Sequence, residues 1–280
     1  MLRLGSVFAL LFFAVPQGGT VPPQCFAEGL SPTCQGPFTG LTKLCLKGCN
    51  LTTFPPDVEK IPMDLTILEI SRNNEFTFIS KGMLSNFVQL TELCLFSNFI
   101  ENIENYSFAK LTALRRLDLS FNQLTFVSKE MLFGLSSLTY LTLWSNKIGF
   151  MKDDSFSHLS ALYHLELFEN SVKRIPSFSF WGLKNLRLLN LRSNPITEIE
   201  IKAFDVSLRP DNIKVNLDKK FLCCSRNHYK QLNYVDQNCT YNGDIVDFET
   251  FDKKCPSSRP KSLDTRIKFV AYPNFPQLLV

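Results

Sequence analysis

The chain repeats itself with a nearly constant period of about 24 residues, a length that falls among those of known repeat proteins. The segment LRRLDLSFNQL, residues 114–124, is one copy of a pattern in which leucines alternate with variable residues and an asparagine follows. The equivalent asparagines are Asn73, Asn98, Asn122, Asn146, Asn170 and Asn194, and only the first step between them is longer, by a single position. A fixed period in the twenties is typical of a solenoid, because each unit has an apolar face that only a stacked neighbour can cover.

Within each unit, the pattern LxxLxLxxN predicts a β-strand with one buried face, since apolar and variable residues alternate with period two. We expect the leucines to point into the stack. After the strand the chain turns away, its backbone groups lose their sheet partners, and a buried asparagine amide can bind them. We therefore predict that the six asparagines form a hydrogen-bonded ladder with a structural role.

The second half of each unit contains further apolar positions. Two residues past the asparagine the chain places Ile100, Leu124, Ile148, Val172 and Ile196. Ten residues past it the chain places Phe108, Leu132, Phe156, Phe180 and Phe204. A column of phenylalanines at constant spacing predicts a packed spine at the back of the coil, and this spine makes most of the 26 phenylalanines structural.

The whole pattern, LxxLxLxxNxLxxIxxxxFxxL over about residues 41–207, resembles the common extracellular class of the leucine-rich-repeat family. The resemblance implies an α/β solenoid: a horseshoe with a concave parallel β-sheet, loops or short helical turns on the convex side, and a disulfide-bonded cap at each end. One period before Asn73 lies Cys49 in LTKLCLKGC, so the first rung has a cysteine in the asparagine position.

The N-terminus indicates export. Residues 1–19 are predicted to be a signal peptide, with Arg3 before the apolar run at 7–15 and two glycines after it. No later run reaches the roughly 20 apolar residues of a membrane helix, so we expect no transmembrane segment. Nine cysteines favour an oxidising compartment. Three acceptor sequons, at Asn50, Asn105 and Asn238, agree with a secreted extracellular glycoprotein.

The family resemblance also divides the chain. It implies an N-terminal cap with the first repeat over residues 20–64, repeats over 65–207 and a C-terminal cap over 208–256; residues 257–280 are predicted to be a disordered tail. The expected cap cysteines are Cys25, Cys34, Cys45, Cys49, Cys223, Cys224, Cys239 and Cys255, and their pairing stays open. Cys94 is left over in mid-repeat, either as an unpaired thiol or as a link to a second chain.

The variable residues between the leucines are expected to face solvent on the concave side. Parallel strands lie about 4.8 Å apart, so Phe96, Trp144 and Phe168, with Tyr140 beside them, should form one aromatic stripe. Exposed aromatic groups dominate interface hot spots, and the neighbouring charges have both signs, which favours a protein partner. The alternative is that the rings only stiffen the sheet. The predicted partner-binding residues are Phe96, Asp118, Tyr140, Trp144, His164, Glu166, Phe168 and Arg192.

Composition argues against several functions. A net charge of +4 is mild for a nucleic-acid binder. The three histidines accompany no nucleophile motif or metal-spaced cluster, so we expect no enzyme activity, no metal and no cofactor. The leading hypothesis is a secreted protein that binds an extracellular protein on its concave face, in recognition or signalling that includes immune recognition.

Two other functions remain open. The chain could be the soluble or truncated ectodomain of a membrane receptor, because the adjacent pair Cys223 and Cys224 resembles that of leucine-rich-repeat G-protein-coupled receptors. It could also be a matrix component that binds glycosaminoglycan through basic residues near the C-terminus. These basic residues are Lys219, Lys220, Lys253, Lys254, Arg259, Lys261, Arg266 and Lys268.

Overall fold

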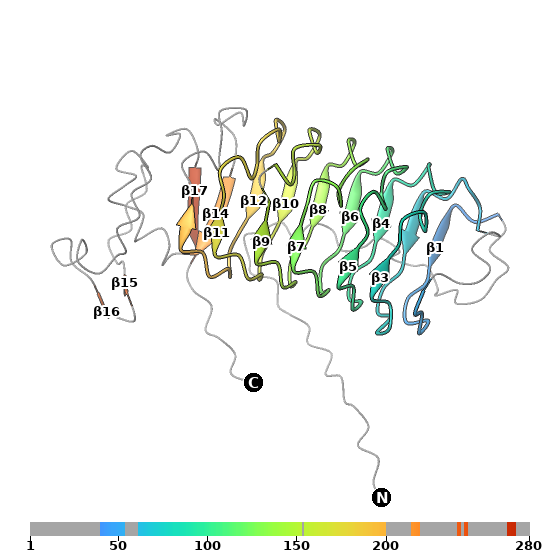
Figure 1. Ribbon diagram of the computed structural model, residues 1–280, viewed down its shortest axis with the longest axis horizontal. Helices are drawn as coiled ribbons and strands as arrows, with labels where there is room; N and C mark the ends of the chain where they lie inside the picture. Colours follow the sequence, from blue (N-terminus) through green and yellow to red (C-terminus); the bar gives the residue numbers. More distant parts are fainter. Residues whose placement is uncertain are drawn as a thin grey trace, which may run out of the picture.

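The computed structural model describes residues 40–53, 61–152, 154–199, 214–218, 240–241, 244–245 and 268–272. One parallel sheet runs along the whole stack (Figure 1). Within the described residues its strands are, in spatial order, β1 (Lys43–Cys45), β2 (Ile67–Glu69), β4 (Glu92–Cys94), β6 (Arg116–Asp118), β8 (Tyr140–Thr142), β10 (His164–Glu166), β12 (Leu188–Asn190), β14 (Lys214–Asp218) and β17 (Lys268–Tyr272).

The strand register confirms the repeat period. Lys43 pairs with Ile67 across β1 and β2, and Ile67 pairs with Glu92 across β2 and β4. The register shifts equal the spacings between repeats in the sequence. The shift from β2 to β4 is longer by one residue, like the spacing from Asn73 to Asn98. Equivalent positions of successive units therefore lie side by side. The stacking in phase confirms the solenoid, and it includes the first rung, where Cys49 replaces asparagine.

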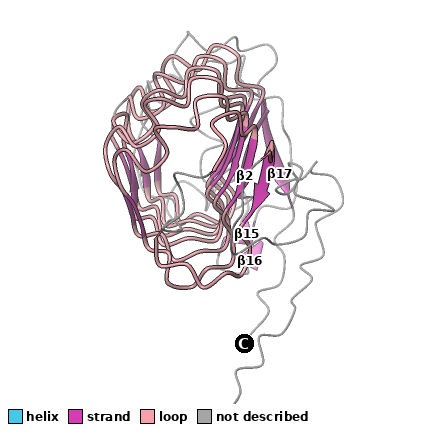
Figure 2. Cartoon of the chain, turned by 90° about the vertical axis from the view of Figure 1, so that its right-hand side faces the viewer, coloured by secondary structure: helices cyan, strands magenta, loops and turns pink. Residues whose placement is uncertain are grey.

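In the coils from β2 to β12, the opposite side carries a second, shorter set of strands (Figure 2). They pair in parallel as β3 with β5, β7 with β9, and β11 with β13. Their bounds are Phe78–Ile79, Asn102–Ile103, Phe126–Val127, Phe150–Met151, Arg174–Ile175 and Glu198–Ile199. Of the two expected forms of the convex side, loops or short helical turns, the helical one is wrong for the described part of the chain, where the convex side consists of short strands and turns.

A physical reason for this difference lies in the convex apolar positions. In each two-residue convex strand of which both side chains are described, the second residue is buried and the first is exposed, as with Val127 and Phe126. One inward residue per coil suits an extended segment that pairs with the equivalent segment of the next coil. Across the residues described here, no helix has the length and hydrophobicity that crossing a membrane requires.

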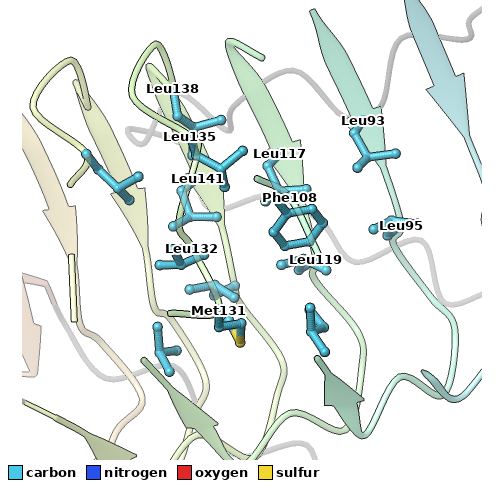
Figure 3. Packing of buried hydrophobic residues seen from close by; sticks show 14 of the residues in the cluster. Leu93, Leu95, Phe108, Leu117, Leu119, Met131, Leu132, Leu135, Leu138 and Leu141 are labelled. Atoms are coloured by element: carbon cyan, nitrogen blue, oxygen red, sulfur yellow. The ribbon is translucent and has the colours of Figure 1, made fainter. Parts of the chain in front are cut away.

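The core is a continuous column of aliphatic and aromatic side chains between the two sets of strands. Leu117, Leu119 and Leu141 project from the long sheet into the interior, where Phe108 and Leu132 also lie (Figure 3). Phe156 and Phe180 are fully buried and stacked, with ring centroids 6.0 Å apart. The predicted spine is thereby confirmed from Phe108 to Phe180, while Phe204 lies outside the described residues.

The asparagine ladder is confirmed as well. The side-chain amide of Asn170 donates to the carbonyl of Leu143 in the preceding coil at 2.9 Å, and its Oδ1 accepts the N–H of Ile148 at 3.0 Å. All six asparagines are at most 8 % exposed. The residue before each of them has a left-handed backbone with φ between 50° and 56°; these residues are Arg72, Ser97, Phe121, Ser145, Glu169 and Ser193.

Two glycines fit coil contacts that a side chain would block. Gly134 has φ +97°, and a Cβ there would lie 2.6 Å from the Cα of Ala109 and from the carbonyl oxygen of Phe108. Gly182 has φ +86°, and its Cβ would lie 2.7 Å from the carbonyl oxygen of Ser157. Both glycines therefore serve a left-handed turn and a close approach to the preceding coil.

The cysteines differ from the prediction at two positions. Cys45, expected in the N-terminal cap disulfides, is a free and buried thiol on β1, whereas Cys94, expected to be unpaired, is disulfide-bonded. Cys49, also predicted to lie in the N-terminal cap, is disulfide-bonded. An odd cysteine count shows that one thiol is left over but not which one. The bonded state of Cys94 removes the basis for a dimer linked through it.

The C-terminal strands also differ from the expected domain boundaries. Residues 268–272, assigned to a disordered tail, form β17 and pair in parallel with β14, which covers the edge that β14 would otherwise expose. The hairpin strands β15 (Thr240–Tyr241) and β16 (Asp244–Ile245) pair antiparallel. The signal peptide and the remaining cap cysteines lie outside the described residues; these cysteines are Cys25, Cys34, Cys223, Cys224, Cys239 and Cys255.

Candidate interaction face

The long sheet arranges the variable residues of successive repeats in three columns. The first column holds the first residue of each strand, the middle column holds the last, and the third column lies two residues beyond the strand. The strand register places equivalent residues of neighbouring strands side by side, for example Arg116 beside Tyr140 and Asp118 beside Thr142. This arrangement puts all eight predicted partner-binding residues on one face.

The third column contains the largest aromatic group on this face. The rings of Trp144 and Phe168 lie 5.9 Å apart at an angle of 35°, and Phe121 packs edge-on against Trp144 at 4.7 Å. All three residues are half-buried. We refer to Phe121, Trp144 and Phe168 as the aromatic triad. Because each ring touches a neighbour, the triad is rigid while part of its surface stays accessible.

Phe96 does not join this group, so the predicted continuous stripe is wrong. Ser120 occupies the third column between Phe96 and Trp144, and it is too small to bridge two strand spacings of about 4.8 Å each. Phe96 instead has the guanidinium of Arg72 over its ring, 5.9 Å from the centroid. The side chain of Phe121, which sequence reasoning did not select, completes the triad from the turn beside the column.

The first column forms a chain of contacts across four strands. The carboxylate of Glu92 lies 3.9 Å from the guanidinium of Arg116, which lies over the ring of Tyr140 at 5.2 Å. Tyr140 in turn lies 5.8 Å from the ring of His164 and 6.2 Å from that of Tyr163. Glu92 and Arg116 keep 28 % and 39 % of their side chains exposed, so both signs of charge are accessible here.

The middle column is more buried than the sequence pattern indicates. Glu166 is 8 % exposed and binds His164, which is 5 % exposed, through a 2.7 Å contact between Oε1 and Nε2. The expectation that His164 and Glu166 face solvent is therefore wrong. Glu166 lies between two larger side chains of its own coil, His164 in the first column and Phe168 in the third, and these shield it. His164 is covered by Glu166 and by the ring of Tyr140, 5.8 Å away.

Asp118, a further middle-column residue, is half-buried. Its carboxylate accepts hydrogen bonds from the backbone N–H of Ser120 at 2.9 Å and from the Ser120 hydroxyl. Burial raises the pKa of the Asp118 carboxyl, the bonds from Ser120 lower it, and the charge of Glu69 raises it, with a net upward shift. Arg192 is half-buried in the third column, where its N–H donates to Asn190 Oδ1 at 3.3 Å.

A free thiol lies at one end of the middle column. Cys45 pairs in register with Glu69, which pairs with Cys94 on the other side. Burial raises the pKa of the Cys45 thiol, and the nearby Glu69 carboxylate raises it further. Such a thiol is a weak nucleophile, so this end of the face offers no activated cysteine.

Several exposed aromatic residues lie outside this face, and the sequence analysis missed them because it treated most phenylalanines as core. Phe126 and Phe150 are register partners on β7 and β9 and are 38 % and 58 % exposed. Tyr106 and Phe133 are 42 % and 41 % exposed on turns that follow convex strands. The available signal was their position: none of them lies ten residues past an asparagine, where the spine phenylalanines occur.

Three further points concern the glycosylation sites, metal binding and the C-terminal basic residues. Asn50 and Asn105 are exposed, and Asn238 lies outside the described residues. Among the described side chains, no group of three histidine, cysteine, aspartate or glutamate residues is arranged to hold a metal ion. The basic residues proposed for glycosaminoglycan lie outside the described part, apart from Lys268 in β17.

Comparison with known proteins identifies the repeats. Residues 89–148 and 136–196 match the family model described as leucine rich repeat. These segments cover the units from β4 to β12 and include the aromatic triad. A search of the curated proteins gave no match.

Proposed function

We propose that this leucine-rich-repeat protein binds another protein through its concave face and acts outside the cell, in recognition or signalling. Proteins built from such repeats interact with other proteins in general. The observation that carries the proposal here is the aromatic triad, a rigid and partly accessible group at the middle of the sheet. Beside it, the pair of Arg116 and Tyr140 adds a charged and an amphipathic contact.

The energetics favour this face as a contact surface. An aromatic side chain can bury about 150–250 Å² in total, so a half-buried ring has substantial area left for a partner. Each triad ring is held by a neighbour and therefore loses little conformational freedom on binding. Rings of this kind, surrounded by polar groups that exclude water, dominate the energy of many protein interfaces.

The size and charge of the face fit a protein. Six strands from β2 to β12 span about 24 Å at roughly 4.8 Å per step, so one partner can contact several coils at once. Glu92 and Arg116 present opposite charges 3.9 Å apart. A polyanion would favour one continuous basic surface, whereas mixed charges beside aromatic rings suit a protein with complementary charges.

Disulfide bonds, an apolar N-terminal run and glycosylation sequons support the proposed extracellular location. Cys49 and Cys94 are disulfide-bonded, and structural disulfides persist in oxidising compartments. The apolar run at residues 7–15 and the sequons at Asn50 and Asn105 support the same location. Secretion would be tested by expression in a eukaryotic host, followed by sequencing of the N-terminus of the protein recovered from the medium.

Binding would be tested by affinity capture from extracellular fluid with the secreted chain as bait. Trp144→Ala and Phe168→Ala each remove one ring of the triad and should abolish capture of any specific partner. Phe150→Ala removes a ring that is 58 % exposed on the convex side and serves as the matched control. Circular dichroism and gel filtration would establish that all three variants keep the fold.

The outcomes separate the possible functions. Loss of a partner with both triad variants, and retention with Phe150→Ala, supports the concave face. Equal capture by the wild type and the triad variants would move the site to the convex side or the caps. Strong retention on heparin that disappears at moderate salt, with no captured protein, would favour the glycosaminoglycan-binding alternative.

A further inference from the structure

A row of exposed side chains crosses four successive coils on the side opposite to the proposed binding face. The ammonium of Lys81 lies over the ring of Tyr106, 5.6 Å from its centroid. Tyr106 packs edge-on against Phe133 at 5.4 Å, and Phe133 packs edge-on against His158 at 5.3 Å. These residues follow β3, β5, β7 and β9 in turn, and we name them the convex ladder.

The convex ladder leaves aromatic surface in contact with water. Tyr106 and Phe133 are 42 % and 41 % exposed although each ring touches two neighbours. Large aromatic groups that are exposed together are uncommon on a monomer and mark a surface that something covers. The fixed ring positions, with a cation at one end and an imidazole at the other, give the ladder an apolar centre and a polar rim.

The chain itself carries an attachment point beside this surface. Asn105 is exposed, directly precedes Tyr106, and belongs to the sequon Asn105-Tyr106-Ser107. Tyr106 has φ +68°, and its N–H donates to the carbonyl of Glu130 in the next coil at 2.9 Å. That coil also carries Phe133, so the backbone at Asn105 is held next to both ladder rings.

We propose that an N-linked glycan on Asn105 packs its first sugar residues over the rings of Tyr106 and Phe133. The inference rests on the proposed extracellular location, because a chain must enter the secretory pathway to meet the N-glycosylation machinery. A pyranose has an apolar face of C–H groups that suits an aromatic ring, and hydroxyls at its edge that suit a polar rim. Lys81 can donate to those hydroxyls from the Tyr106 end of the ladder.

The modification itself is a simple group transfer. The side-chain nitrogen of Asn105 forms a bond to the anomeric carbon of N-acetylglucosamine while the bond from that carbon to a lipid diphosphate breaks. The nitrogen loses one proton, and the lipid diphosphate leaves with the bonding electrons. The co-reactant is a lipid-diphosphate-linked oligosaccharide, and no oxidant or reductant takes part.

The position of Ser107 indicates whether the glycan is attached before or after the coil folds. Its hydroxyl is buried in the folded coil, where it donates to the carbonyl of Glu104 at 2.7 Å. Ser155 and Ser179 make the equivalent bonds to Lys152 and Pro176 in later coils, so this serine also has a structural role. Transfer to Asn105 therefore precedes closure of its coil, and the ladder forms around a glycan that is already attached.

The test uses the full chain secreted from a glycosylating eukaryotic host, with occupancy measured by peptide mass spectrometry. Asn105→Gln removes the glycan. The control is Thr52→Ala, which destroys the sequon of Asn50 but leaves Asn50 itself, with its left-handed φ of 53°, unchanged. We expect Asn105→Gln to lower Tm by about 2–4 °C, the shift of one modest contact in a chain of this length. It should also raise the fluorescence of a bound hydrophobic dye, whereas Thr52→Ala should change neither reading.

A second comparison shows whether the glycan contacts the rings. In a Phe133→Ser background the effect of Asn105→Gln on dye binding should shrink, while in a Phe150→Ser background it should persist. Nuclear magnetic resonance of the wild type should show sugar protons shifted upfield by the ring currents. An occupied Asn105 whose removal has the same effect with and without Phe133, and whose sugar protons are unshifted, would overturn the inference.

The remaining outcomes distinguish this inference from the proposed function. If Asn50 is modified and Asn105 is not, the inference is overturned and the extracellular location stands. If neither asparagine is modified in a protein recovered from the medium, the inference fails while secretion is supported. If the protein stays in the cytosol, with Asn50 and Asn105 both unmodified, the inference and the extracellular location fail together.

Discussion

Replacement of Asn122 gives the sharpest test of how the coils hold together. Its side-chain amide donates to the carbonyls of Leu95, Leu119 and Ser120 at 2.9, 3.0 and 3.1 Å. Its Oδ1 accepts the N–H of Ile100 at 3.0 Å. Asn122→Leu keeps a similar side-chain size and removes all four bonds, so the cost depends on which backbone groups keep another partner.

The three carbonyls do keep a partner. Leu95 O still accepts from the Asn98 amide, Leu119 O from the Asn146 amide, and Ser120 O from the N–H of Ser97, each at 2.9 Å. The N–H of Ile100 loses its acceptor in a buried position. One orphaned buried donor costs about 1–3 kcal/mol, and the lost carbonyl bonds add to it. We expect Asn122→Leu to lower the free energy of unfolding by about 2–4 kcal/mol.

Asn122→Asp should behave differently. The carboxylate still accepts the Ile100 N–H, but at neutral pH it places a buried negative charge against three carbonyl oxygens, a loss of about 3–5 kcal/mol. Burial raises the pKa of this carboxyl in the folded variant above its unfolded value of about 3.9. The folded state then binds more protons, so the stability deficit of this variant is largest at high pH and shrinks as pH falls through the folded pKa.

The assay is denaturant unfolding from pH 7 to pH 4, together with hydrogen exchange at the Ile100 amide. Exchange reports the local opening of the coil, which matters because solenoids need not unfold in one step. Gln123→Leu is the control, since Gln123 is half-buried beside Asn122 but stands outside the asparagine ladder. An unchanged Ile100 exchange rate in Asn122→Leu, or wild-type stability of Asn122→Asp at pH 7, would refute the reasoning.

Three further predictions concern single residues. Gly134→Ala should destabilise the fold by about 2–5 kcal/mol, because the strain of a left-handed backbone adds to a Cβ contact at 2.6 Å. Gly40→Ala has the backbone strain but no close Cβ contact, so it should cost about 1–2 kcal/mol. Cys45 should resist alkylation in the native protein and react fully in denaturant, because burial shields the thiol and raises its pKa. Burial raises the pKa of Asp118 in the folded state, so the wild type loses stability as pH rises from the unfolded pKa of about 3.9 through the folded pKa. Asp118→Asn should therefore be more stable than the wild type at neutral pH, but not below pH about 3.9.

Each of these predictions has a contrary result. Equal melting temperatures for Gly134→Ala and Gly40→Ala would show that the neighbouring coil yields without cost. Alkylation of Cys45 in the native state at the rate of an exposed thiol would show that β1 opens readily. A stability difference between Asp118→Asn and the wild type that does not change with pH would show that the carboxyl does not titrate differently on folding.

The repeat period made the long sheet, the ladder and the spine predictable. Leu117 and Leu119 are buried because their alternation in the sequence matches the two faces of a strand. Asn122 is buried because it follows that strand at the turn. These features depend on local spacing, and local spacing is visible in one chain. The same spacing placed Trp144 and Phe168 on neighbouring strands.

Other features depended on contacts between residues that the pattern treats as equivalent. Phe96 and Phe168 share a repeat position, yet only Phe168 touches Trp144, because Ser120 interrupts the column on the other side. His164 and Glu166 alternate with leucines like any exposed pair, yet they close on each other and become buried. Side-chain size decides the first outcome, between neighbouring strands, and complementary hydrogen-bonding groups decide the second, within β10.

The sequence by itself determined the period, the buried leucines, the asparagine ladder and the aromatic residues available on the concave face. Tertiary structure decided that Cys45 is a free thiol, that Cys94 is bonded, that the convex side of the described coils is built of short strands and turns, and that Tyr106, Phe133 and His158 meet in a ladder. The physical reason is that periodicity records which side of its own backbone a residue occupies. Which neighbour that residue meets depends on side chains a full repeat away along the chain and on how the coils stack.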